Sequence, residues 1–249
     1  MYNRFIIGNT IHRLATVNST NSYAKEFANI NKPAEGCVII ADEQTQGRGQ
    51  YGNKWTTQAG KNLTFSIILH PKFLKIGEQF LLSQAVALGV ATYLKSKTTR
   101  NIFIKWPNDV FIENAKVCGM LIENALQGNI ISESIVGIGL NINETDFAEI
   151  PNATSLAAIT QQVYDLPAEL ELLLNAIDKF YLQLMQGRQH LIREQYHQYL
   201  FRKNEASVFM LNNEKVSGII QGVNVAGQLE VIIDGTLQRF NNKEIAFVY

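Results

Sequence analysis

Short, strongly apolar segments alternate along this chain with longer segments of helical periodicity. The short segments are rich in β-branched residues and have the length of buried strands. They lie at residues 37–41, 63–69, 102–104, 117–123 and 135–142. A sheet of these strands would be buried on at least one face and must be covered by helices.

Apolar residues at helical spacing predict those helices. Residues 78–94 place Phe80, Ala87 and Leu94 on one face that would cover the sheet, and residues 22–30 predict a shorter helix with its cap at 19–21. A second long helix follows Pro167, and Gly187 separates it from a further helical stretch that ends near residue 199. Strands and helices mixed in this way indicate an α+β domain.

The pattern changes near residue 204 to short strand-like runs. They are separated by the turn signals Asn212-Asn213, Ala226-Gly227 and Asp234-Gly235. This pattern predicts a small β-barrel of roughly 45 residues. We therefore expect two domains, at residues 1–200 and 201–249.

Charge and composition exclude several classes of protein. Lys and Arg total 22 and Asp and Glu total 22, so there is no net charge to attract nucleic acid or an anionic membrane. The N-terminal apolar stretch is too short for a signal peptide, and no run reaches the roughly 18 apolar residues of a membrane span. The two cysteines lie in or beside apolar runs, which is typical of buried thiols in a reducing compartment. We expect a cytoplasmic protein.

Residues 47–52 match the pattern G-x-G-x-x-G, but not in a dinucleotide-binding context. Five polar residues separate the preceding strand from Gly47, and the residues after Gly52 are a poor helix start. The interval between Glu43 and Glu78 contains no acidic residue. It contains the cations Arg48, Lys54, Lys61, Lys72 and Lys75. A glycine-rich, electropositive loop is suited to binding an anion through its backbone N–H groups, although a flexible surface turn would have the same composition.

Three further segments bear polar residues at the ends of predicted elements. Asn108-Asp109 follow one strand, and Lys116 begins the next with Gly119 inside it. Residues 137–143 end a buried strand with two amides, and residues 18–21 precede a helix. Each segment alone has a structural explanation: a solvated lysine, a turn or a helix cap.

Taken together, five motifs make the chain resemble the biotin protein ligase family. They are STN at 19–21, GRGQYGNKW at 47–55, KWPND at 105–109, K-x-x-G-x-L-x-E at 116–123 and GIGLNIN at 137–143. The resemblance implies a mixed, mainly antiparallel sheet packed by helices, as in class II synthetases, with a small SH3-like C-terminal barrel. It implies an enzyme that forms biotinyl-5'-AMP from biotin and ATP with Mg²⁺. The biotinyl group would then be transferred to one lysine of a biotin carboxyl carrier protein, such as that of acetyl-CoA carboxylase.

The same resemblance implies roles for individual residues. The residues expected to bind biotin are Ser19, Thr20, Asn21, Gln44, Gly47, Arg48, Gly49, Gln50, Lys116 and Gly119. Those expected to bind ATP or the adenylate are Arg48, Gln50, Trp55, Asn108, Lys116 and Asn141. Arg48 and Lys116 are the expected catalytic residues, so they should share one cavity. No protein ligand for a metal is assigned.

The loop departs from the arginine-rich pattern GRGRRGRxW of the family. Gln50, Tyr51 and Asn53 stand where that pattern has its later arginines, so we expect the loop to hold the adenylate less firmly. Gln50→Arg should therefore slow dissociation of the adenylate from the protein. Equal dissociation rates for the native protein and the variant would reject the hypothesis.

Other family members carry an N-terminal helix-turn-helix domain of about 60 residues and act as repressors. Here the 19–21 motif lies almost at the first residue, so we expect a ligase that does not bind an operator. The oligomeric state stays open, a homodimer being one option. Two alternatives to a biotin ligase are a lipoate protein ligase, whose substrate lacks a ureido group, and a noncatalytic binding module.

Overall fold

The computed structural model describes residues 6–147 and 152–248. Its main sheet has seven strands in the order β1-β2-β3-β7-β6-β5-β4, with β1 and β2 parallel and all other neighbours antiparallel. The strands are Ile11–Val17 (β1), Cys37–Gln44 (β2), Leu63–Leu69 (β3), Ile102–Lys105 (β4), Asp109–Ile112 (β5), Ala115–Gln127 (β6) and Ile130–Leu140 (β7). The sequence-based prediction of a mainly antiparallel sheet in an α+β fold is confirmed.

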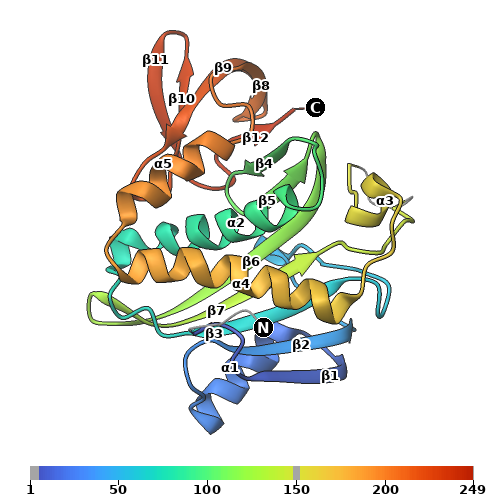
Figure 1. Ribbon diagram of the computed structural model, residues 1–249. Coiled ribbons are helices and arrows are strands. Elements are labelled where there is room, and N and C mark those ends of the chain that lie inside the picture. The colour runs from blue at the N-terminus through green and yellow to red at the C-terminus, as the bar shows by residue number, and fades with distance from the viewer. Residues whose placement is uncertain (1–5, 148–151, 249) are drawn as a thin grey trace.

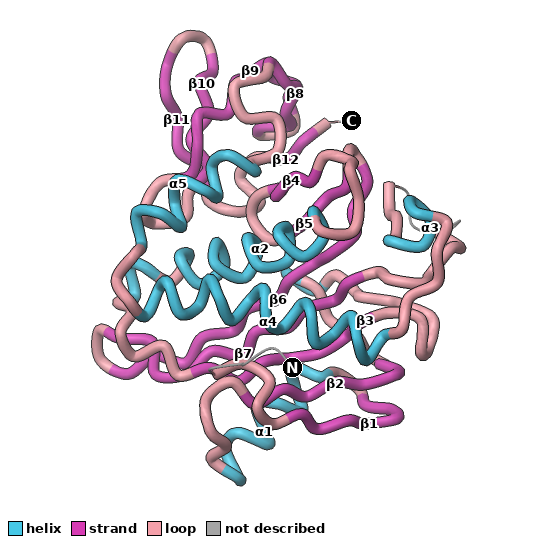
Figure 2. The backbone as a smooth tube through the Cα atoms, in the orientation of Figure 1, coloured by secondary structure: helices cyan, strands magenta, loops and turns pink. Residues whose placement is uncertain are grey.

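Helices cover the two faces of this sheet unequally (Figures 1 and 2). The long helices α2 (Phe80–Lys95) and α4 (Leu166–Met185) lie side by side on one face, where the buried side chains of Val38, Phe65 and Val136 meet them. The shorter α1 (Thr20–Asn31) covers part of the opposite face. Successive side chains of a strand point to opposite faces of the sheet. The strand residues that alternate with these core positions therefore lie on the face that carries α1.

A five-stranded antiparallel sheet forms the C-terminal part of the chain, in the order β11-β10-β9-β8-β12. Its strands are Ala206–Leu211 (β8), Glu214–Val223 (β9), Leu229–Ile233 (β10), Thr236–Phe240 (β11) and Ala246–Phe247 (β12). Helix α5 (Gln189–Tyr199) leads into this C-terminal sheet (Figure 1). Trp106 Nε1 donates to Gly227 O at 2.9 Å, and Val223 N donates to His197 Nε2 at 3.0 Å. These two bonds connect the C-terminal sheet to the part of the chain that contains the main sheet and its helices.

The structure adds elements that the hydrophobic pattern did not predict. They are β1, β5, β12 and the short helix α3 (Leu156–Thr160). Strand β1 lies at the edge of the sheet with a mixed, partly exposed face, and β5 has only four residues. Both therefore lack a long apolar run. Among the described residues, no helix is long and apolar enough to cross a membrane.

The partial burial of His197 predicts a dependence of stability on pH. Burial lowers the pKa of His197 below its ordinary value of 6.5. The unfolded chain then binds the proton more readily, so the free energy of unfolding should fall as the pH drops below about 6.5. Chemical denaturation at several pH values should show a weaker dependence for His197→Gln than for the native protein.

His190 offers a matched control, because it is an exposed histidine of the same helix α5. His190→Gln should keep the native dependence of stability on pH. If His197→Gln and His190→Gln show the same dependence of stability on pH, His197 is not its source.

Candidate active site

Glycines create a trough in the face of the sheet that carries α1. Gly137 lies beside Leu121 on one neighbouring strand and Ser66 on the other, and Gly139 lies in the same way between Gly119 and Thr64. Other side chains occupy the space above the glycines. A Cβ at Gly137 would lie 2.2 Å from Asn21 Oδ1, and one at Gly139 would lie 2.2 Å from Trp55 Cε2.

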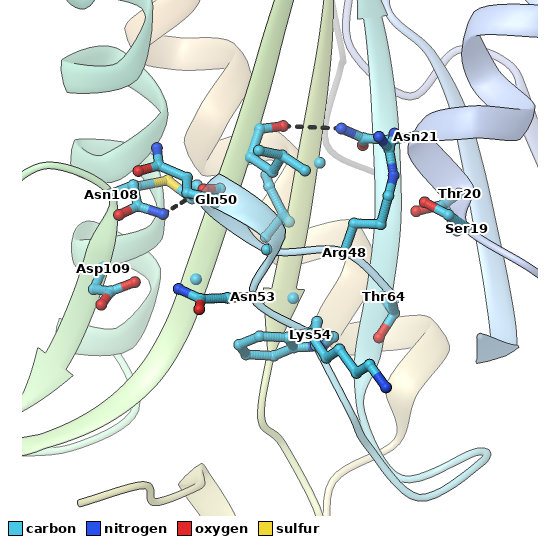
Figure 3. Close-up of a pocket in the computed structure, with 18 of the residues that line it drawn as sticks. Ser19, Thr20, Asn21, Arg48, Gln50, Asn53, Lys54, Thr64, Asn108 and Asp109 are labelled. Carbon is cyan, nitrogen blue, oxygen red and sulfur yellow. Dashed lines mark hydrogen bonds between the residues drawn. The ribbon is translucent and has the colours of Figure 1, made fainter. Parts of the chain in front are cut away.

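This trough is the floor of a cavity of about 230 Å³, which we call the central cavity. Figure 3 shows Ser19, Thr20 and Asn21 on one side of it, Asn108 and Asp109 on the other, and Asn53 between them. The sequence-predicted residues that line it are Ser19, Thr20, Asn21, Gln44, Arg48, Gly49, Gln50, Trp55, Asn108, Lys116 and Gly119. Motifs as far apart in the sequence as residues 19–21 and 137–139 therefore meet at one place.

The two remaining predicted residues lie close by. Gly47 lines a recess that it shares with Arg48 and Trp55. Asn141 lines a second cavity of about 620 Å³, to which Trp55 and Lys116 also contribute. The Asn141 side chain is buried and donates to Thr154 O at 3.0 Å, so part of its role is to hold the chain around this second cavity.

A buried network of hydrogen bonds forms one end of the central cavity. Gln44 Oε1 accepts from Thr20 N at 2.7 Å and from Thr20 Oγ1 at 3.0 Å. Asn21 Nδ2 donates to Leu121 O at 3.1 Å and to Glu123 Oε2 at 2.8 Å. Ser66 Oγ lies 2.8 Å from Thr20 Oγ1 and 2.6 Å from Asn21 Oδ1. This end is therefore a preorganised polar surface with fixed side-chain orientations.

The glycine-rich segment is a short hairpin rather than a helix start, as its sequence context predicted. Gly49 N donates to Asn53 O at 2.7 Å and Trp55 N donates to Gly47 O at 3.0 Å, around a turn at Gln50–Gly52. The hairpin thus uses the Gly49 N–H internally, and in this structure that group is not directed at a ligand. A Cβ at Gly47 would lie 2.1 Å from Trp55 O, so glycine is required there for the close approach of the two strands of the hairpin.

Two of the five cations predicted in the acid-free interval, Arg48 and Lys54, line the central cavity. Lys61, Lys72 and Lys75 are not among its lining residues. The electropositive character expected of the whole interval is therefore concentrated at the hairpin.

Each expected catalytic cation is paired with a carboxylate of the sheet. Arg48 Nη2 lies 3.0 Å from Glu123 Oε2, and Lys116 Nζ lies 2.7 Å from Asp109 Oδ1. Lys116 Nζ also lies 5.7 Å from the centre of the Trp55 ring, within cation–π range. The indole Nε1 is buried and has no hydrogen-bond partner among the residues that the structure describes. The wall of the central cavity thus includes the Lys116–Asp109 ion pair, the Arg48 guanidinium and the Trp55 ring, and Glu123 lines the neighbouring recess.

The sequence did not reveal roles for Ser66, Glu123, Asp109 and Asn242. Ser66 is one of two hydroxyl residues, with Thr64, in an otherwise apolar strand, and this was the available signal. Glu123 and Asp109 end motifs that were recognised, but their pairing with Arg48 and Lys116 depends on the fold. Asn242 comes from the C-terminal sheet, and nothing in its local sequence indicates a site.

Comparison with known proteins agrees with this geometry. Residues 14–141 match the model of the biotin/lipoate A/B protein ligase family. The biotin–[acetyl-CoA-carboxylase] ligase of Paracoccus denitrificans is 30% identical over 87% of this chain and 91% of its own length. A solved structure, the biotin protein ligase from Aquifex aeolicus in complex with biotin and ATP, is 27% identical. It covers 96% of this chain and 98% of its own, with a TM-score of 0.79.

Some relatives are longer. The bifunctional ligase/repressor BirA of Bacillus spizizenii is 34% identical over 68% of this chain, and the match spans about half (53%) of that relative's length. The family model nevertheless covers half of the chain, and the match to the Paracoccus ligase covers most of both proteins. The chain belongs to the biotin/lipoate A/B protein ligase family.

Proposed function

We propose that the chain is a biotin protein ligase, which forms biotinyl-5'-AMP from biotin and ATP and then transfers the biotinyl group to a lysine of a biotin carboxyl carrier protein. The observation that carries this proposal is the central cavity, which has a buried polar network at one end and both Arg48 and Lys116 in its walls. We assign catalysis to residues 1–200 and treat 201–249 as a second domain. The two buried free cysteines support a cytoplasmic location.

The polar end of the cavity fits the ureido ring of biotin. A ureido group has two N–H donors and one carbonyl acceptor, and hydroxyl and amide side chains can pair with both. Ser19, Thr20 and Asn21 supply such groups, with Gln44 behind them. The dithiolane ring of lipoate has no N–H or carbonyl group, so it would cover this polar surface without adding hydrogen bonds to it, which costs free energy. The network therefore favours biotin over lipoate.

In the first half-reaction, a carboxylate oxygen of biotin attacks the α-phosphorus of ATP. A new C–O–P linkage forms, and the bond to the leaving pyrophosphate breaks. Two anions must approach one another, so cations near both of them lower the barrier. Lys116 lines both the central and the second cavity, and Arg48 extends from the hairpin into the central one. We place the acid in the central cavity and the nucleotide in the second, with Trp55 and Lys116 between them.

In the second half-reaction, the amine of the carrier lysine attacks the acyl carbon of the adenylate. The bond between the acyl carbon and the phosphate oxygen breaks, AMP leaves, and the new amide nitrogen loses a proton. The attacking nucleophile comes from the carrier, so the protein does not need a nucleophile of its own. Its contribution is to orient the adenylate and keep its charge neutralised.

Magnesium fits this site as an ion bound to the nucleotide. Among the residues that the structure describes, there is no group of three or more His, Cys, Asp or Glu side chains that could form a metal site. The nearby carboxylates, Asp109 in the central cavity and Glu123 in the adjoining recess, are each already paired with a cation. Magnesium commonly binds through substrate phosphates and few protein ligands, and it would supply charge neutralisation on the phosphoryl oxygens.

Incubation with ATP, magnesium, labelled biotin and an apo carrier domain tests the proposal directly. The native protein should label the carrier on one lysine, and Lys116→Ala should label it far more slowly. A noncatalytic binding module would label neither, and its affinity for partners would not depend on Lys116. Absence of labelling by the native protein would reject the proposed function.

A further inference from the structure

The C-terminal sheet reaches into the wall of the central cavity. Asn242 and Lys243, in the turn between β11 and β12, are among its lining residues. Asn242 Nδ2 donates to Gln50 Oε1 at 2.7 Å. Gln50 begins the turn of the glycine-rich hairpin and lies two residues from Arg48. A contact between residues 192 positions apart thus connects the C-terminal sheet to the hairpin.

The turn that presents Asn242 is itself well fixed. Asn241 donates to the Glu244 carboxylate from its backbone N at 2.6 Å and from its Nδ2 at 3.0 Å. Ile245 is buried immediately after it. The sheet below is attached to the main domain through Gly227, which accepts from Trp106 and approaches the Phe80 ring so closely that a Cβ would lie 2.7 Å from Cγ. Asn242 is therefore held by a rigid support.

Backbone hydrogen bonds hold the hairpin together. Gly49 N donates to Asn53 O and Trp55 N donates to Gly47 O at its base, and Asn53 N donates to Gln50 O at 3.1 Å around the turn. Arg48 is also held by its ion pair with Glu123. Gly52 at the turn has a φ of +83°, and a Cβ there would meet nothing within 4 Å. A side-chain bond to the first residue of the turn therefore limits how far the tip can move, and Arg48 moves with it.

We propose that Asn242 is a positioning residue for the ligase reaction: it holds the glycine-rich hairpin through Gln50 and so keeps Arg48 directed into the central cavity. The role of Arg48 in this inference rests on the proposed function. The restraint on the hairpin does not, and it can be measured in the free protein. An arginine at position 50 would lose the carbonyl acceptor that Asn242 uses but would add a cation to the hairpin. The slower adenylate dissociation expected for Gln50→Arg therefore requires the added charge to outweigh the lost restraint.

Trypsin provides the first measurement, because it cleaves after Arg48 and Lys54 on the two sides of the hairpin tip. Trypsin can cleave the folded protein at these sites only when the hairpin opens locally. Loss of one hydrogen bond should therefore speed cleavage at the two sites by about three- to tenfold. This is the expectation for both Asn242→Ala and Gln50→Ala. The double variant should be cleaved no faster than either single variant, because both changes remove the same bond.

Two matched variants separate this role from general destabilisation. Gln50→Glu keeps an acceptor for Asn242 and should retain native resistance to cleavage. Gln238→Ala removes an amide of β11 outside the cavity lining and should also behave as native. The thermal unfolding midpoint should stay unchanged in all of these variants. Native cleavage rates in Asn242→Ala, or additive effects in the double variant, would overturn the proposal.

The second measurement concerns the reaction. Asn242→Ala should raise the dissociation rate of biotinyl-5'-AMP by about three- to tenfold, as expected for one lost hydrogen bond. An unchanged dissociation rate in a protein with faster hairpin cleavage would reject the link to Arg48. If the native protein makes no adenylate, the proposed function fails, while the cleavage comparison still decides whether Asn242 restrains the hairpin.

Discussion

Replacing Arg48 by alanine is expected to slow adenylate formation by about a hundredfold to a thousandfold. A cation about 4 Å from an anion is worth roughly 4 kcal/mol at an effective dielectric of about 20, and a tenfold change in rate corresponds to about 1.4 kcal/mol. The Arg48 side chain is 46% exposed, so screening by solvent places the effect toward the lower part of this range. Single-turnover formation of biotinyl-5'-AMP measures it.

Lys61 provides the matched control, because it belongs to the same acid-free interval but does not line the central cavity. Lys61→Ala should form the adenylate at the native rate. Arg48→Lys should recover part of the lost rate, since it keeps the charge without the planar guanidinium. A rate for Arg48→Ala within twofold of native would remove Arg48 from the mechanism.

Gly137→Ala is expected to weaken biotin binding by about a hundredfold, the loss of two or three hydrogen bonds of roughly 1 kcal/mol each. The new Cβ would lie 2.2 Å from Asn21 Oδ1 and 2.9 Å from Asn21 Cγ. Neither partner can move freely, because Gly137 lies within β7 and the Asn21 amide is bonded to Ser66 and Leu121. The methyl group must therefore displace Asn21 and disrupt the polar end of the cavity.

Isothermal titration with biotin measures this loss, and circular dichroism checks that the variant is folded. Gly77→Ala is the control, because a Cβ at Gly77 meets nothing within 4 Å. It should bind biotin as the native protein does. Equal biotin affinity for Gly137→Ala and Gly77→Ala would show that Asn21 is not part of the biotin site.

Much of the fold was predictable from local pattern. The strand at Leu63–Leu69 is buried along its whole length and therefore appears in the sequence as an apolar run, interrupted by the hydroxyl residues Thr64 and Ser66. The edge strand β1 is only partly buried, so its alternation is mixed and it was missed. Helix α2 is buried on nearly all sides between the sheet and α4. Its Gly89 is so close to the other helix that a Cβ would lie 2.6 Å from Ile177 Cα.

The site was predictable to the extent that its residues lie in motifs. Arg48, Lys116 and Asn21 were singled out from their segments, and the fold brings them to one cavity. Their partners were not predictable, because pairing depends on three-dimensional neighbours. Arg48 meets Glu123 from 75 positions away, and Gln50 meets Asn242 from 192 positions away. No local sequence pattern predicts contacts between residues so far apart in the chain.

Biotin-dependent exchange of labelled pyrophosphate into ATP tests most directly the central claim that one cavity joins a biotin carboxylate to a nucleotide phosphate. The native protein should catalyse exchange with biotin and not with lipoic acid, and the Arg48→Ala/Lys116→Ala double variant should lose it. Exchange that requires lipoic acid, or exchange with biotin that survives the double substitution, would contradict the claim.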